Sequence, residues 1–230
     1  MMILKKIILS VAALGSLTAC ASEPAPQVWE INSLSQIGGH AVSVLGNPQL
    51  IDTDYGKAVA FDGDGDRLLV ANNPLAGAEA FTVEIIFRPR DVWPANPEPR
   101  FFHIEAADNP DRRLTIELRL NDRKEWYLDT YIKSEKSQAV LIDDSLVHPV
   151  NEWAHAAVTY QGRQMTAYVN GRKELTAEVD YLPIAPEAAT SIGARMNQVH
   201  WFNGDILLTR VTHAVLAPED FLTMEKLPKQ

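Results

Sequence analysis

Two neighbouring segments of the chain, residues 113–121 and 125–133, present charged and aromatic side chains at alternating positions. An arginine can grip a ligand carboxylate through parallel hydrogen bonds, a tyrosine ring can stack on an apolar surface, and a carboxylate can accept a proton. Together, such groups could hold a polar polymer or act on it. The residues of these segments that we select as ligand-binding candidates are Arg113, Glu117, Arg119, Asp129 and Tyr131.

A second dense polar stretch runs from Arg195 to Phe202. It lies between two predicted strands, and loops carry function more often than cores do. We therefore select Arg195, Asn197 and Trp201 as further ligand-binding candidates. The alternative is a polar hairpin whose aromatic residues pack inward.

Arg88 and His155 complete the candidate set, because each lies in a predicted strand that could join the first two. The alternative for the whole set is a solvated sheet surface with cross-strand ion pairs, each worth about 0.2–1 kcal/mol. If the protein is an enzyme, the candidates for acid, base and charge-stabilising roles are Glu117, Arg119, Tyr131, His155 and Arg195.

An aspartate- and glycine-rich segment, Asp62-Gly63-Asp64-Gly65-Asp66, offers oxygen ligands of the kind that Ca²⁺ prefers. It does not fit a helix–loop–helix calcium motif, because Arg67 stands where glycine is required and Asn73 where a bidentate glutamate is required. A tight turn between two strands is the favoured interpretation. No histidines pair at zinc-ligand spacing, and no Gly-x-Ser-x-Gly motif occurs.

The elements that position these residues are predicted to be strands. Apolar residues alternate with polar ones, which indicates half-buried strands and is incompatible with one face of a helix. The clearest such segments are 80–89, 113–121 and 125–133, and residues 153–160 and 164–170 are predicted to form a hairpin. Residues 89–99 hold four prolines and predict a long loop in which Trp93 is exposed. A short helix is expected only over residues 217–226, which begin Ala-Pro-Glu-Asp.

The N-terminus carries an export signal. Lys5 and Lys6 precede an apolar run that ends at Leu17, and this run is too short to cross a bilayer as a helix. The following Leu17-Thr18-Ala19-Cys20 resembles the lipobox of bacterial lipoproteins. The resemblance implies cleavage before Cys20 and lipidation of its thiol. Ala21, in place of aspartate, implies the outer membrane of the cell envelope in a Gram-negative organism.

This interpretation divides the chain into three parts. Residues 1–19 form the signal peptide, residues 20–27 the lipidated cysteine with a short extended tether, and residues 28–230 one domain. The net charge is −9, and it becomes −11 once Lys5 and Lys6 are removed. Such a charge argues against nucleic acid as a partner. Cys20 is the only cysteine, so the domain lacks disulfides and must be stabilised by packing.

Four segments in order carry a family resemblance: Gly56–Gly63, Phe81–Pro89, Trp153–Gly171 and Ser191–Glu219. Together they resemble the laminin G-like, concanavalin A-like superfamily over about residues 40–222. The resemblance implies an all-β jelly roll of two antiparallel sheets, with ligands bound on the concave sheet or at the loop edge.

Calcium binding is one point at which the chain departs from that pattern. Leu207 and Leu208 replace an acidic pair that many relatives carry near a structural Ca²⁺. Asp62, Asp64 and Asp205 remain the only candidate ligands for that ion, and no other cofactor is indicated.

The leading functional hypothesis is binding of a glycan or polysaccharide at the cell envelope. Retaining glycosidases of this superfamily use Glu-x-Asp-x-x-Glu, whereas Glu178-Val179-Asp180 here lacks the third acid. Glu117-Leu118-Arg119 and Gln198-Val199-His200 resemble parts of an alginate lyase site, but their surroundings match poorly. A polysaccharide lyase or hydrolase is therefore the alternative, and a protein-interaction module is the second alternative.

The lipid anchor leads to a direct prediction. Replacing Cys20 with serine removes the thiol that would carry the lipid, so the protein should move from the membrane fraction to the soluble fraction and keep its fold. Fractionation of cells expressing each form measures this. Retention of Cys20→Ser in the membrane after signal cleavage would show that the lipoprotein interpretation is wrong.

Overall fold

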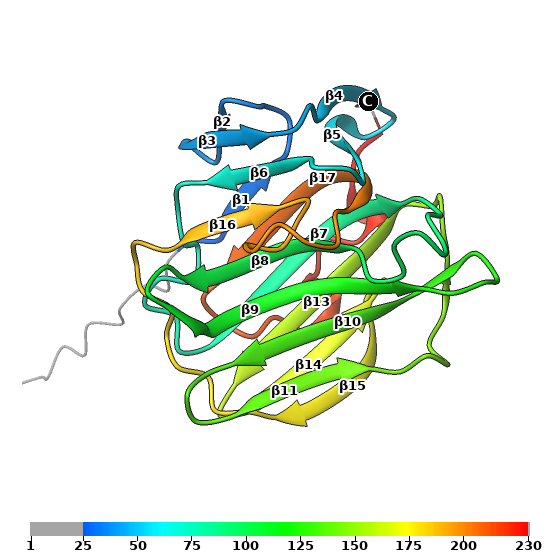
Figure 1. Cartoon of the computed structure of the whole chain (residues 1–230). Coiled ribbons are helices and arrows are strands. Elements are labelled where there is room, and N and C mark those ends of the chain that lie inside the picture. The colour runs from blue at the N-terminus through cyan, green and yellow to red at the C-terminus, as the bar shows by residue number, and fades with distance from the viewer. Residues whose placement is uncertain (1–24, 230) are drawn as a thin grey trace, which may run out of the picture.

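The computed structural model describes residues 25–229 and consists of two antiparallel β-sheets packed face to face (Figure 1). The predicted all-β, two-sheet class is therefore confirmed. The predicted signal peptide and Cys20 lie outside the described residues. Gln27, predicted to end the tether, already pairs with Val211 in the first strand. Within residues 25–229, no helix has the length and apolar character needed to cross a bilayer.

One sheet has eight strands. Its order from edge to edge is β15 (Arg172–Glu178), β14 (Gln164–Val169), β13 (Ala154–Gln161), β7 (Phe81–Pro89), β17 (Asn203–Thr212), β5 (Gly56–Asp62) and β4 (Gln49–Thr53), with β1 (Gln27–Glu30) also paired to β17. The chain leaves this sheet after β1, β5, β7 and β15, and each time it crosses to the facing sheet.

The other sheet has nine strands. Its order is β11 (Gln138–Ile142), β10 (Glu125–Lys133), β9 (Asn109–Leu120), β8 (Arg100–Ala106), β16 (Ala189–Ile192), β6 (Arg67–Val70), β3 (His40–Leu45) and β2 (Gln36–Ile37), with β12 (His148–Pro149) beside β10. Strands β8 to β11 follow one another in the sequence and in space. The two polar segments found in the sequence are therefore neighbours in this sheet.

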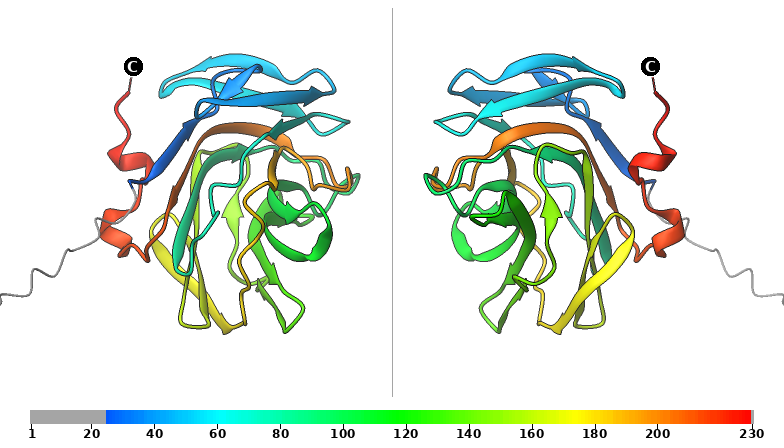
Figure 2. Two further views of the ribbon diagram at one scale, coloured as in Figure 1. Left: turned by 90° about the vertical axis from the view of Figure 1, so that its left-hand side faces the viewer. Right: turned by 90° about the vertical axis from the view of Figure 1, so that its right-hand side faces the viewer.

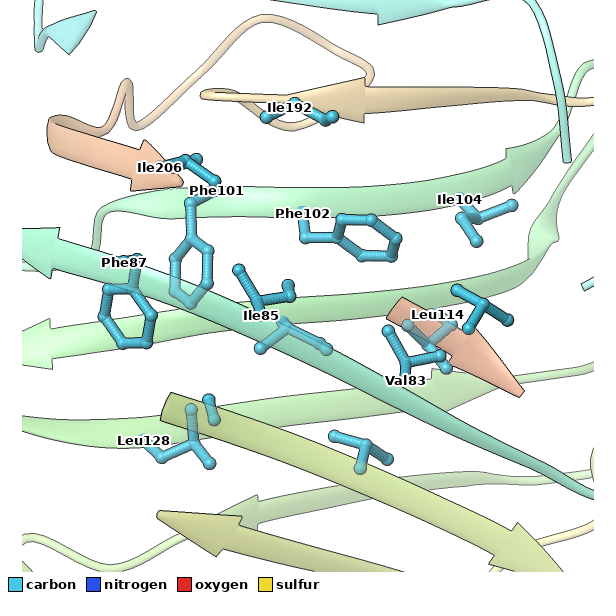
Figure 3. Close-up of a cluster of buried hydrophobic side chains, with 14 of the residues drawn as sticks. Val83, Ile85, Phe87, Phe101, Phe102, Ile104, Leu114, Leu128, Ile192 and Ile206 are labelled. Atoms are coloured by element: carbon cyan, nitrogen blue, oxygen red, sulfur yellow. The ribbon is translucent and has the colours of Figure 1, made fainter. Parts of the chain in front are cut away.

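The core lies between the sheets and is built from the apolar half of each alternating strand (Figure 3). Phe87 of β7 stacks on Phe101 of β8, with ring centroids 4.5 Å apart, and meets the edge of Trp126 at 5.2 Å. Val83 and Ile85 extend the same row on β7 and are fully buried. Because strands alternate, this inward row fixes the polar residues of the same strands on the outer faces.

The C-terminal segment does not form the expected helix. It contains only two 3-10 turns, at Pro218–Asp220 and Met224–Lys226, separated by extended residues. Phe221 has backbone angles of φ −67° and ψ 149°, which ends the first turn. This extended conformation lets the fully buried Phe221 ring pack against His155 and Tyr168, at centroid distances of 5.6 and 5.0 Å. Tertiary packing thus overrides the local helix signal.

This segment covers part of the outer face of the eight-stranded sheet, as the side views show (Figure 2). Beneath it, the carboxylate of Glu84 is fully buried and accepts hydrogen bonds from the Leu222 amide at 2.7 Å, from His155 Nε2 at 3.1 Å and from Arg210 Nε. Burial alone would raise the pKa of Glu84, but these three donors hold it below its usual range. Glu84 therefore joins three strands to the C-terminal segment.

Removing the charge of Glu84 should strongly destabilise the fold. In Glu84→Gln the largely buried Arg210 loses its carboxylate partner, and breaking a buried ion pair costs about 3–5 kcal/mol. The urea unfolding midpoint measures this. The control Glu79→Gln alters an exposed glutamate and should change the free energy of unfolding by less than about 0.5 kcal/mol. Equal midpoints for the two variants would contradict the role given to Glu84.

The stability of the fold should also depend on pH through the same carboxylate. Because the pKa of Glu84 is lower in the folded than in the unfolded chain, its stabilising contribution is complete above the unfolded value of about 4.3. It is lost as pH falls through the folded pKa. The free energy of unfolding should therefore decrease below about pH 4.3, and less steeply in Glu84→Gln. Parallel pH profiles for the two proteins would contradict this linkage.

Candidate functional site

The outer face of the nine-stranded sheet carries most of the sequence-selected residues. The alternation that points Leu114, Ile116 and Leu118 into the core turns the intervening side chains of β9 outward. We call the outward side chains of β8, β9 and β10 the polar face. Its members are Arg100, His103, Glu105, Arg113, Glu117, Arg119, Tyr127, Asp129 and Tyr131.

Two carboxylates lie side by side at the centre of the polar face. Strand register places Glu117 opposite Asp129, and Arg100 opposite Glu117 on the other side. Arg100 Nε donates to Glu117, and Arg119 donates to Asp129 through Nε at 2.8 Å and approaches it through Nη2 at 2.6 Å. Glu98 bridges both arginines, at 3.0 Å from Arg100 Nη2 and 2.6 Å from Arg119 Nη1. The network also fixes the end of the loop that precedes β8.

The pKa values of the three carboxyls differ for physical reasons. Burial raises the pKa of Glu117 and of Asp129, and their mutual repulsion raises that of Glu117 further, against the opposing effect of Arg100 and Arg119. For Glu98, burial is outweighed by Arg119 and Arg100, which lower its pKa. Glu117 and Asp129 are only 6% and 2% exposed. Both are therefore covered groups that hold arginines in place.

The loop between β16 and β17 crosses over the start of β8. The Met196 amide donates to His103 Nδ1 at 2.8 Å, and the Arg100 amide donates to the carbonyl of His200 at 2.9 Å. Burial, followed by repulsion from Arg195, Arg113 and Arg100, holds the pKa of His103 well below its usual range. A neutral His103 can accept the Met196 hydrogen bond, and this anchor brings Arg195 to the polar face.

Two arginines on this face have no carboxylate partner. In residues 25–229, no carboxylate oxygen lies within 4.0 Å of the guanidinium nitrogens of Arg113 or Arg195. Arg113 lies over the ring of Tyr131, at 5.0 Å from the ring centroid. The Arg195 guanidinium donates no hydrogen bond to any described residue, and its Nε is buried without a partner. Apart from the hydrogen bond that Arg113 Nη1 donates to the carbonyl of Pro110, these two guanidinium groups are available to a ligand anion.

An open cleft of about 690 Å³ lies at the end of the polar face where β9 turns into β10. Its lining combines two aromatic residues, Trp93 and Tyr127, with hydrogen-bonding groups. The residues that line it include Trp93, Glu98, Arg119, Asn121, Tyr127 and Ser145. Trp93 is 43% exposed, which confirms the prediction for the proline-rich loop. The aromatic residues of such a cleft can stack on a ring of a ligand, and its polar residues can bind hydroxyl groups of that ring.

The structure brings six of the selected residues together: Arg113, Glu117, Arg119, Asp129, Tyr131 and Arg195. Asn197 is exposed in the adjoining loop, and Trp201 forms a bridge with Arg100 beside the polar face.

The prediction that Arg88 and His155 could join this set is wrong. Both lie on strands of the opposite sheet, where Arg88 pairs with Asp205 at 2.7 Å and His155 contacts Glu84 under Phe221.

Sequence reasoning missed Glu98, Arg100 and His103. Glu98 and Arg100 flank Pro99 at the end of a proline-rich loop, so no alternation marks them as members of a strand surface. His103 does alternate with Phe102 and Ile104 in β8. That alternation, read together with the neighbouring polar strands, is the signal that could have identified it.

Two of the three candidate calcium ligands, Asp205 and Asp62, already have partners. Arg88 and Arg90 both pair with the fully buried carboxylate of Asp205, so guanidinium groups neutralise it. Asp62 accepts the amide of Asp64 at 2.7 Å within a turn between β5 and β6, as the sequence favoured. Across residues 25–229, no three His, Cys, Asp or Glu side chains are grouped to hold a metal ion.

Several solved structures share this fold. Domain 4 of AbnA, a GH43 extracellular arabinanase from Geobacillus stearothermophilus, solved in complex with arabinotriose, is 17% identical with a TM-score of 0.65, over 86% of this chain and 97% of that chain. The binding domain of botulinum neurotoxin serotype D/C is 17% identical with a TM-score of 0.61, over 85% and 50%. The binding domain of botulinum neurotoxin DC in complex with SialylT is 19% identical with a TM-score of 0.60, over 85% and 49%.

This chain therefore spans about half the length of the two neurotoxin domains, and at these identities the likeness concerns the fold alone. No curated protein sequence matches. Residues 62–220 match the model of a laminin G-like family described as the concanavalin A-like lectin/glucanases superfamily. Because this match covers more than half of the sequence, the chain belongs to the concanavalin A-like lectin/glucanases superfamily.

Proposed function

We propose that the protein is a glycan-binding module and that the glycan lies along the polar face with one sugar in the cleft. The observation that carries this proposal is the cleft itself, in which Trp93 and Tyr127 offer ring surfaces beside Glu98, Arg119 and Asn121. Sugar rings have apolar faces and hydroxyl edges, so they suit such a lining. Complexes of similarly folded domains with arabinotriose and with SialylT add support.

The polar face suits binding better than catalysis. An acid–base pair must reach the proton that it transfers, at about 2.6–3.2 Å. Glu117 and Asp129 are covered and hydrogen-bonded to Arg100 and Arg119. Their raised pKa values favour the alternative of a polysaccharide-degrading enzyme, but this function needs the arginines to move away first. Release of reducing ends or of unsaturated products from a polysaccharide would support the enzyme.

A protein-interaction module receives less support. The exposed apolar residues are spread over the molecule, with Val28 on β1, Leu50 on β4, Val140 on β11 and Val215 near the C-terminus. A protein-docking surface usually needs a contiguous apolar patch. Location at the cell envelope through a lipid on Cys20 remains part of the proposal, and it rests on the sequence.

Affinity electrophoresis tests the proposal. Mobility of the purified chain is measured in gels that contain neutral polysaccharides, arabinan among them, or acidic polysaccharides. At least one polysaccharide should retard the protein. Trp93→Ala and Tyr127→Ala should each weaken that binding about 2- to 10-fold, because loss of an aromatic contact removes about 0.5–1.5 kcal/mol. Tyr55→Ala, on the other sheet, is the control and should bind normally.

Two outcomes would contradict the proposal in different ways. If no polysaccharide retards the protein, the function is wrong. If a polysaccharide binds but Trp93→Ala and Tyr127→Ala bind as tightly as Tyr55→Ala, the function stands and the assigned face is wrong.

A further inference from the structure

We propose that Arg113 and Arg195 form a subsite for an acidic sugar, in which both guanidinium groups bind the carboxylate or sulfate group of one glycan residue. This inference rests on the proposed function, since it assigns the class of glycan that the polar face binds.

The distribution of charges on the polar face is the first argument. Arg100 and Arg119 are fully engaged by three carboxylates, as described above. Arg113 and Arg195 are both half-buried, yet within the described part of the chain neither forms an ion pair. Half-buried cations are normally matched by an anion, because partial loss of hydration is costly without one. Two unmatched cations on one small surface indicate that the missing anion belongs to a ligand.

Mutual repulsion is the second argument. Burial lowers the pKa of Arg195, and the positive charges of Arg113 and Arg100 lower it further. Glu117 and Glu105 oppose this shift, but neither forms an ion pair with Arg113 or Arg195. Glu117 pairs with Arg100, and Glu105 lies 3.4 Å from His103 Nε2. An oxyanion placed between Arg113 and Arg195 would relieve the repulsion and receive charge-assisted hydrogen bonds.

The Arg113 side chain and the backbone beside Arg195 are held in place before a ligand arrives. Arg195 precedes Met196, whose amide is anchored on His103 and whose carbonyl accepts from Arg67 Nη1 at 3.4 Å. Arg113 lies on the ring of Tyr131, and the Tyr131 hydroxyl donates to Gln138 at 2.6 Å. Preorganised donors lose little side-chain freedom on binding, so more of their interaction energy contributes to affinity.

The distance between the cleft and Arg113 indicates that the ligand is a polymer. Arg113 and Arg119 lie six residues apart on β9, which corresponds to roughly 20 Å at about 3.3 Å per residue. A glycan of several sugars lying along the strand can therefore reach the cleft and the two arginines together.

Matched pairs of glycans test this inference by isothermal titration calorimetry with the purified chain. Oligogalacturonate is compared with its methyl ester, which has the same backbone without the charge, and dextran sulfate is compared with dextran. The acidic member of at least one pair should bind at least about 10-fold more tightly, and the active pair shows whether a carboxylate or a sulfate is bound. Higher salt should weaken this binding.

Variants then test whether Arg113 and Arg195 cause the tighter binding of the acidic glycan. Arg113→Gln and Arg195→Gln should each weaken binding of the acidic glycan at least about 10-fold, and neither change disrupts an ion pair of the fold. Arg163→Gln is the control, because it makes the same charge change at an exposed turn between β13 and β14. Thermal unfolding checks that all three remain folded.

The inference is overturned if each neutral glycan binds as tightly as its acidic counterpart, or if Arg113→Gln and Arg195→Gln bind like Arg163→Gln. In either case binding of a neutral glycan would leave the proposed function intact. If neither these glycans nor any polysaccharide of the electrophoresis panel binds, the proposed function fails and the subsite fails with it.

Discussion

The polar face depends on the burial of two like charges in adjacent strands. Glu117 and Asp129 are cross-strand neighbours, and an antiparallel sheet places such neighbours about 5 Å apart. Two carboxylates at this spacing are tolerated because Arg100 and Arg119 neutralise them and Glu98 joins the two arginines. These ion pairs fix the loop before β8 and build one wall of the cleft. Because Glu98, Glu117 and Asp129 pair with Arg100 and Arg119, they form no ion pair with Arg113 or Arg195.

The two outer faces of the sandwich have different roles because the C-terminal segment lies on only one of them (Figure 2). On the eight-stranded sheet, Phe221 and Leu222 cover Glu84 and His155, and the Glu84 carboxylate accepts its hydrogen bonds from within the chain. On the nine-stranded sheet, the arginine and tyrosine side chains that point outward from β9 and β10 stay partly exposed beside a cleft. A ligand that needs charged and aromatic contacts therefore finds them on the second face.

Much of the fold follows from period-two patterns that can be read in the sequence. Residues 113–121 and 125–133 alternate so clearly that their inward and outward sides are predicted correctly, and the structure pairs them as neighbouring strands. The alternation does not say to which sheet a strand belongs. For that reason the sequence suggests that Arg88 and His155 belong with the polar face. Their strands, β7 and β13, lie in the opposite sheet. The residues near Pro218 favour a helix on local grounds. Burial of Phe221 against the sheet overrides this preference, and the local sequence does not reveal that burial.

The central claim is that a glycan binds to the outer face of the nine-stranded sheet. Mapping of NMR chemical shifts during titration with oligogalacturonate tests this most directly, because it reports both faces in one experiment. We predict shifts for Tyr127, Tyr131 and Arg195, with His155 and Phe221 unchanged. Shifts confined to His155, Phe221 and their neighbours would contradict the account, because they would place the ligand on the face that the C-terminal segment covers.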